Sequence, residues 1–287
     1  METEMEVASA MLQASDTQPA VLPGESLPWP KDVCLYQPLE ETQLLLPEQA
    51  SCLAVKTYLR MCRLPYTERQ CDNAEFMSTG GRLTKLPLMR LGRRLFAEFE
   101  PIVVHVECTQ LANAVSSWMG FEEREDMRSE VTYVENTFTL AELHQCFKEA
   151  SIYADHTQPR IGSAHPWPLS SIRRREKSEE ALRLLRVYQW DELSTRGVQV
   201  QLQQCCQLLS DKLEAHESNG KLSANYLYGQ QLCELDALVF GHVASILNSQ
   251  LACPMLSDTV RAYPRLVAHS RGIDQVYHQG KQLGGQE

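Results

Sequence analysis

The chain has 287 residues, of which 43% are hydrophobic and 22% charged, a balance typical of globular proteins and not of disordered or fibrous ones. Its 37 acidic residues outnumber its 27 basic ones and give a formal charge of −10, which disfavours a nucleic-acid-binding surface because phosphates require basic groups. The length suggests about two domains, and no apolar run approaches the roughly 18 residues of a membrane span.

Residues 1–28 are predicted to form a tail. The segment has acidic residues but no Lys or Arg, so it lacks both the positive start of a secretory signal and the arginines of a mitochondrial presequence. One short helix is expected over Met5 to Leu12, and the prolines from Pro19 to Pro30 predict an extended connection after it.

Strand and helix signals alternate through residues 29–108, which we expect to form one domain. The pattern predicts a strand at Val33 to Tyr36, a loop through Pro47, a helix with Cys52, Val55, Leu59 and Cys62 on one face, a strand at Tyr66 to Cys71, a hairpin around Gly92 and a helix from Pro101. That order of elements is the order of a thioredoxin-like domain.

Helix signals alone fill residues 122–278, the second expected domain, and residues 279–287 read as a frayed tail. Five amphipathic helices are predicted, with apolar stripes that include Met127 to Ala141, Ile172 to Tyr188, Val198 to Leu213, Leu235 to Leu247 and Leu266 to Val276. The fourth is apolar over most of its circumference and should be central, with His242 as a hydrogen-bonded core residue.

The ten cysteines are scattered and form no C-x-x-C pair, so buried, reduced thiols are the simplest interpretation. The eight histidines do not cluster either. We therefore expect no metal site.

A thioredoxin-like domain followed by an all-helical domain resembles the glutathione transferases, an α/β plus all-α fold. Ser51 to Leu59 resembles the first helix of that fold, and Leu64-Pro65-Tyr66 resembles its exit. Leu86-Pro87 resembles the cis proline that opens the hairpin, and Cys233 to Asp236 resembles the capping box of the central helix.

Within that fold the chain is similar to the metaxin family. The similar blocks occur in order from residue 29 to about 250: Trp29-Pro30, Leu35-Tyr36-Gln37, Asn73 to Ser78, Pro101-Ile102-Val103, His165 to Leu169 and Glu234 to His242. The resemblance implies a peripheral protein on the cytosolic face of the mitochondrial outer membrane, with some cytosolic material. It also implies a membrane-anchored metaxin partner, a link to the sorting and assembly machinery that inserts β-barrel precursors and to mitochondrial transport adaptors, and no cofactor.

The pair Glu98-Phe99 argues against transferase chemistry. Transferases keep an acidic residue or Gln followed by Ser here, and the hydroxyl binds the carboxylate of glutathione. A phenylalanine is expected to fill that pocket wall and remove a partner worth roughly 1.5–3 kcal/mol. Tyr36, Ser51 and Cys52 remain possible thiol-activating groups, although each also reads as a packed aromatic, a helix cap or a buried thiol.

Asp236 stands three residues after Cys233, the spacing at which its carboxylate accepts from the backbone N–H of residue 233. A thiol is a weak acceptor, so only half of this capping box should work. The pattern predicts a structural role for Asp236 and a loss of about 0.5–2 kcal/mol on mutation to alanine.

Trp167 lies between two prolines, where it either anchors a partner or packs into the helical core. Arg173, Arg174 and Arg175 are followed by compensating acids and read as a solvated helix face or as a contact for anionic lipid. We predict a non-catalytic adaptor. A cytosolic glutathione-dependent transferase or thiol enzyme and a structural homodimer are the alternatives.

Overall fold

The computed structural model describes residues 28–71, 86–110, 113–163, 165–217, 226–249 and 251–279. Three expected features lie outside these residues: the helix over Met5 to Leu12, the metaxin-like block Asn73 to Ser78 and the tail from residue 280. Among the described residues, no helix combines the length and apolar character needed to cross a bilayer.

Four strands form a mixed sheet with the order β2-β1-β3-β4. They are β1 (Cys34–Gln37), β2 (Thr67–Gln70), β3 (Leu88–Leu91) and β4 (Arg94–Ala97). Because α2 (Leu46–Met61) carries the chain from β1 across to β2, these two strands pair in parallel, whereas β3 is antiparallel to β1 and β4. The predicted strands, the hairpin and the thioredoxin-like order are confirmed.

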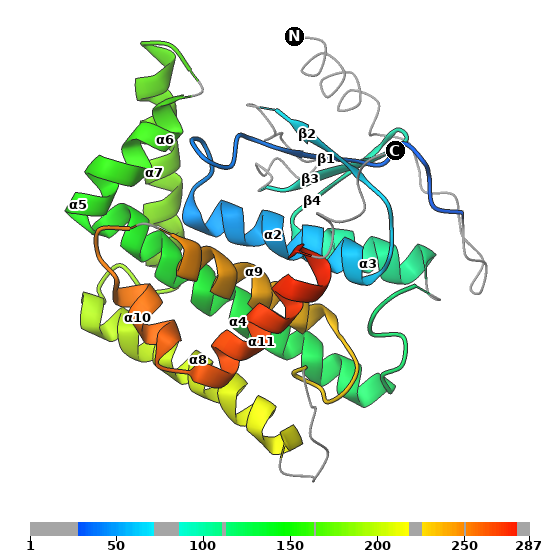
Figure 1. Ribbon diagram of the computed structural model, residues 1–287. Helices are drawn as coiled ribbons and strands as arrows, with labels where there is room; N and C mark the ends of the chain where they lie inside the picture. Colours follow the sequence, from blue (N-terminus) through cyan, green and yellow to red (C-terminus); the bar gives the residue numbers. More distant parts are fainter. Residues whose placement is uncertain are drawn as a thin grey trace.

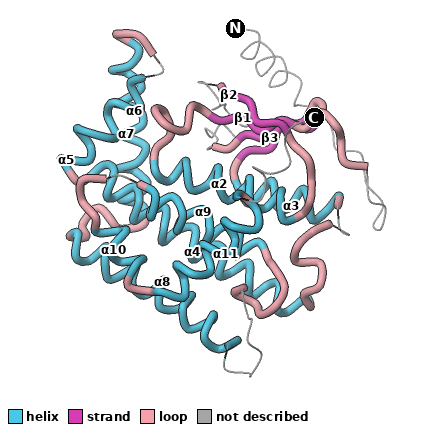
Figure 2. Tube along the Cα trace, in the orientation of Figure 1, coloured by secondary structure: helices cyan, strands magenta, loops and turns pink. Residues whose placement is uncertain are grey.

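The two helices of this region start earlier than expected. Pro47, assigned to the preceding loop, lies in the first turn of α2, where its missing N–H costs no hydrogen bond. In the same way α3 (Phe99–Thr109) begins before Pro101. Figures 1 and 2 show that the sheet lies on α2 and α3 as an outer layer.

The described residues after α3 are mainly helical, as predicted. The helices are α4 (Phe121–Lys148), α5 (Ala150–Ile152), the π-helical turn η1 (Tyr153–Thr157), α6 (Gln158–Ser163), α7 (Leu169–Val187), α8 (Thr195–Glu217), α9 (Glu234–Asn248), α10 (Met255–Arg261) and α11 (Pro264–Tyr277). The five predicted helices correspond to α4, α7, α8, α9 and α11. Three predicted core positions are wrong, since Ile172, Tyr188 and Val276 are exposed.

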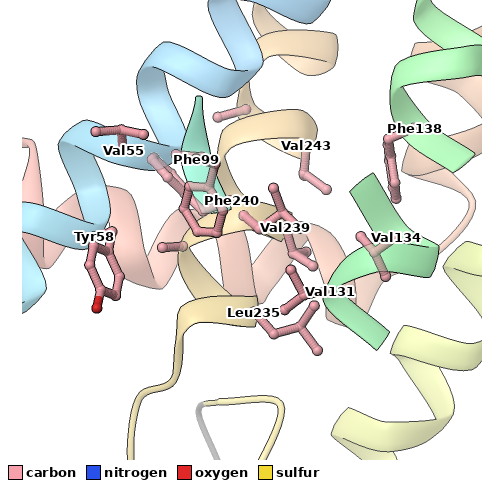
Figure 3. Close-up of a cluster of buried hydrophobic side chains, with 14 of the residues drawn as sticks. Val55, Tyr58, Phe99, Val131, Val134, Phe138, Leu235, Val239, Phe240 and Val243 are labelled. Atoms are coloured by element: carbon pink, nitrogen blue, oxygen red, sulfur yellow. The ribbon is translucent and has the colours of Figure 1, made fainter. Parts of the chain in front are cut away.

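The central position predicted for α9 is confirmed. Every residue of α9 from Glu234 to Ile246 is buried, and its closest neighbour is α2. One cluster of apolar side chains therefore joins the sheet region to the helices (Figure 3). It includes Val55 and Tyr58 of α2, Phe99 of α3, Val131, Val134 and Phe138 of α4, and Leu235, Val239, Phe240 and Val243 of α9.

A buried hydrogen bond between two side chains links α9 to α4. The ring Nδ1 of His242 lies 2.9 Å from Oε1 of Glu142, and both side chains are almost completely buried. Burial raises the pKa of Glu142, and the neighbouring His242 opposes that rise. His242 also stacks on Phe138, with 5.2 Å between ring centroids, so its predicted role as a hydrogen-bonded core residue is confirmed.

The carboxyl of Glu234 makes the stability of the protein depend on pH. Burial and the nearby Glu107 raise the pKa of Glu234 from 4.5 to about 7, although Ser116 donates a hydrogen bond to it. The folded state therefore holds this proton more tightly than the unfolded chain. The resulting stabilisation is complete below the unfolded pKa and is lost as pH rises through about 7.

As pH rises from about 5 to about 8, the native protein is expected to lose about 2–3 kcal/mol of stability relative to Glu234→Gln, because glutamine never ionises. Denaturant unfolding at the two pH values measures the difference. The matched control is Glu100→Gln at an exposed position of α3, which should shift stability equally at both pH values. If the free energy of unfolding of Glu234→Gln changed with pH as much as that of the native protein, Glu234 would not be the source of the pH dependence.

Candidate functional site

A cavity of about 120 Å³ lies where the sheet region meets the helices. The start of α2, the residues that open β3 and α3, and the facing sides of α4 and α7 enclose it. Its lining residues are Leu45, Pro47, Glu48, Ser51, Leu86, Glu98, Glu135, Thr139, Leu143, Phe147, Lys177, Glu180, Ala181 and Leu184. This is the part of the fold where the sequence places the transferase-like motifs.

The cis proline expected at the start of the hairpin is present. The Leu86-Pro87 peptide bond is cis, and the N–H of Glu98 donates to the carbonyl of Pro87 over 3.0 Å. Glu98 has φ +73 and precedes α3, with its side chain on the cavity.

The position predicted for Phe99 is wrong. Its ring was expected in the cavity wall, but it is 1% exposed, does not line the cavity, and meets the ring of Tyr58 edge-on with 6.0 Å between centroids. Figure 3 shows it inside the apolar core. The ring of Phe99 therefore points into the core and does not fill the cavity.

One of the three thiol-activating candidates lines the cavity, and the other two lie together in a second, smaller buried cluster. Tyr36 is fully buried in a second small cluster, beneath the guanidinium of Arg90, and does not reach the cavity. Cys52 is in that same cluster, and burial raises the pKa of its thiol far above the ordinary value. Ser51 is the candidate that lines the cavity. The interpretations of Tyr36 as a packed aromatic and Cys52 as a buried thiol are confirmed.

Negative charge dominates the cavity lining. It contains Glu48, Glu98, Glu135 and Glu180, while the ammonium of Lys177 lies 2.9 Å from Glu48. Two carboxylates of a glutathione molecule would meet this acidic wall. The volume is also below the roughly 300–1,000 Å³ of ordinary small-molecule sites. The cavity is therefore both small and acidic.

Asp236 makes more contacts than a helix cap requires. Its carboxylate accepts from the backbone N–H of Cys233 at 2.9 Å, as predicted, and from the N–H of Leu227 at 2.9 Å. The ring of His269 lies 2.8 Å away, and the thiol of Cys233 donates to it over 3.2 Å. The thiol is therefore a donor here, and the carboxylate joins α9, α11 and the preceding loop.

The core alternative for Trp167 is wrong, because 82% of its surface is exposed. It lies in the turn before α7, with Leu169 and Ile172, also exposed, in the first turn of that helix. Figure 1 shows this turn at the far end of α7, away from α8 and α11. Sequence reasoning missed Leu169, and it placed Ile172 in the core because the helical period fitted.

The three consecutive arginines near the start of α7 divide into two kinds. Arg173 pairs with Glu176 at 3.3 Å and Arg175 pairs with Glu179 at 2.7 Å, both on the solvated face. Such exposed pairs contribute little to stability. The guanidinium of Arg174 instead lies over the backbone of Gly162 and joins α7 to α6. The predicted face with compensating charges is confirmed for Arg173 and Arg175.

Comparison with known proteins relates the chain to mitochondrial proteins. Residues 52–178 match the outer mitochondrial membrane transport complex protein family, and residues 202–273 match the glutathione S-transferase C-terminal domain. The chain is 34% identical to metaxin-2 of Homo sapiens over 90% of this chain and 93% of that protein. It is 32% identical to the metaxin-2 homolog of Caenorhabditis elegans over 76% of this chain and 89% of that protein.

Solved structures confirm the fold. A glutathione S-transferase of Ceriporiopsis subvermispora, in complex with glutathione, matches with a TM-score of 0.53 at 9% identity, covering 89% of this chain and all of that one. A glutathione S-transferase of Actinobacillus pleuropneumoniae matches with a TM-score of 0.50 at 13% identity, covering 87% of this chain and 91% of that one. The predicted glutathione transferase-like fold is therefore confirmed.

Proposed function

The chain belongs to the metaxin family, and from this premise we propose that it is a non-catalytic adaptor subunit of a transport complex in the mitochondrial outer membrane. Family membership supports a place in the transport complex, and the chemistry of the cavity supports the absence of catalysis. The observation that carries the second point is the acidic lining of a cavity of about 120 Å³, in which Lys177 is already paired.

The finer proposal concerns the partner. We infer that the chain pairs with a membrane-anchored metaxin on the cytosolic face, as a peripheral subunit, and supports the sorting machinery that inserts β-barrel precursors. A fold without chemistry still offers large helical surfaces for assembly. Structural roles are proposed for Pro87, Glu98 and Asp236, which shape the turn into α3 and the start of α9.

Affinity purification from detergent-solubilised mitochondrial outer membranes tests the proposed assembly. The chain is expected to recover a membrane-anchored metaxin in stoichiometric amount, and cross-linking before lysis should preserve the pair. Recovery of this chain alone, at concentrations where the native complex is intact, would contradict the adaptor function.

A glutathione-dependent enzyme is the second candidate, favoured by the fold and by Ser51 on the cavity. We expect the purified chain to pass through glutathione-agarose and to leave a generic electrophile unconjugated, because the acidic lining repels the carboxylates of the tripeptide. A transferase of known activity serves as the positive control. Robust turnover that disappears in Ser51→Ala would overturn the adaptor proposal.

A further inference from the structure

The exposed and half-exposed side chains at the start of α7 have an order along the helix axis. Trp167 and Leu169 lie at the end of the helix, Ile172 follows, and Arg173 and Arg175 come next. We refer to these five residues as the α7 tip. At 1.5 Å per residue, the arginines lie about 6–9 Å behind Leu169 along the axis.

The charge of α7 is opposite to that of the whole chain. Residues 169–187 contain six Lys or Arg and three Glu, whereas the chain has a formal charge of −10. The nearby Glu40 is engaged by Lys56 at 3.6 Å, and the adjoining backbone is held against α6 by Arg160 and Ser163. The basic end of α7 therefore contrasts with an otherwise acidic protein.

Among the described residues, the other strongly exposed aromatic ring has the reverse surroundings. Phe121, at the start of α4, is 80% exposed and is followed by Glu122, Glu123, Glu125 and Asp126. An acidic surrounding disfavours contact with anionic headgroups. Exposure of an aromatic ring alone does not distinguish the α7 tip, but its combination with arginines does.

We propose that the α7 tip docks onto an anionic phospholipid surface. Trp167, Leu169 and Ile172 enter the headgroup region, where tryptophan is enriched and where apolar groups of peripheral helices reach about 5–10 Å deep. At that depth Arg173 and Arg175 lie level with the phosphates. The pair of Arg175 with Glu179 is exposed and the pair of Arg173 with Glu176 is half-exposed, so phosphates replace those carboxylates at low cost.

A lipid surface fits these observations better than a protein pocket does. The apolar side chains lie at the end of the helix, and the cationic side chains follow them along its axis. A bilayer has the same order, with apolar acyl chains inside and anionic phosphates further out. Arg174 lies against the backbone of Gly162, so it packs between α6 and α7 and is not part of the α7 tip. The identity of the membrane rests on the proposed function, because the α7 tip would face the mitochondrial outer membrane that holds the complex.

Flotation of the full chain with phosphatidylcholine vesicles, with and without phosphatidylserine, tests the proposal. The native chain is expected to float with the anionic vesicles, and the double variant Arg173→Gln/Arg175→Gln should bind about tenfold more weakly. The matched control Arg183→Gln/Arg186→Gln removes the same charge from exposed positions further along α7, more than a Debye length away, and should stay within about twofold.

Trp167→Ser is expected to lower vesicle binding about tenfold, and Phe121→Ser should leave it unchanged. Brominated lipid should quench the tryptophan fluorescence of the native chain, and most of that quenching should vanish in Trp167→Ser. Trp29 and Trp190 are partly buried, and Trp118, 37% exposed, lies just before α4 with its ring N–H donating to the carbonyl of Leu232. Both aromatic rings are at least 80% exposed, so circular dichroism should show unchanged folding in the two variants.

Three results would overturn the proposal: no flotation of the native chain, equal flotation of Trp167→Ser, or equal weakening by the two arginine pairs. Loss of a metaxin partner in Trp167→Ser without any vesicle binding would assign the α7 tip to a protein instead. The vesicles contain no partner subunit, so failure here leaves the co-purification test of the proposed function unaffected.

Discussion

Asp236→Ala is expected to lower the free energy of unfolding by about 3–5 kcal/mol, because each buried hydrogen-bond donor left without an acceptor costs about 1–3 kcal/mol. The side chain is fully buried, and its loss leaves the N–H groups of Leu227 and Cys233 and the ring of His269 without an acceptor. The cap inferred from sequence accounts for about 0.5–2 kcal/mol of this effect. The remainder comes from partners that only the fold brings together.

Denaturant unfolding followed by circular dichroism measures this loss. The matched control is Asp258→Ala, which removes an exposed carboxylate from the first turn of α10 and should cost less than about 1 kcal/mol. Equal stability of the two variants would show that the buried network around Asp236 does not hold α9 and α11 together.

The second large effect is expected for Gly241→Ala, which should destabilise the protein by about 3 kcal/mol. A Cβ at Gly241 would lie 2.4 Å from the carbonyl oxygen of Ala50 and 2.8 Å from the Cβ of Ala54. Alanine favours a helix over glycine by about 1 kcal/mol, but here α2 would have to move as a whole. The steric cost therefore exceeds the gain in helix propensity.

Gly272→Ala is the control for that substitution. Gly272 lies within α11, and a Cβ there would meet no atom within 4 Å. The same change should therefore stabilise the protein by about 0.5–1 kcal/mol through helix propensity. Opposite signs in the two thermal midpoints are expected. If Gly241→Ala stabilised the protein, the distance between α2 and α9 would have to be larger than in the structure.

Patterns of apolar residues predicted the parts of the fold that are determined locally. The helix around Val239 is apolar nearly all round, and a central position follows from that composition alone. Short helices were missed, because α6 and α10 are too brief for a period to emerge and are held by packing against longer neighbours.

The candidate site was predictable in its motifs but not in its geometry. The sequence located the pair Glu98-Phe99, yet the positive φ of Glu98 and the direction of the ring into the core depend on tertiary packing. Likewise, helical spacing cannot show which face of α7 is covered, so Ile172 was assigned to the core although it is exposed.

The dependence of localisation on a membrane-anchored metaxin tests the central claim most directly. In cells depleted of that partner, the fraction of this chain that sediments with mitochondria should fall to a small remainder, because the α7 tip alone provides a weak lipid contact. Re-expression of the partner should restore it. An unchanged mitochondrial fraction after depletion, or a chain that remains in the cytosol while the partner is present, would contradict the account.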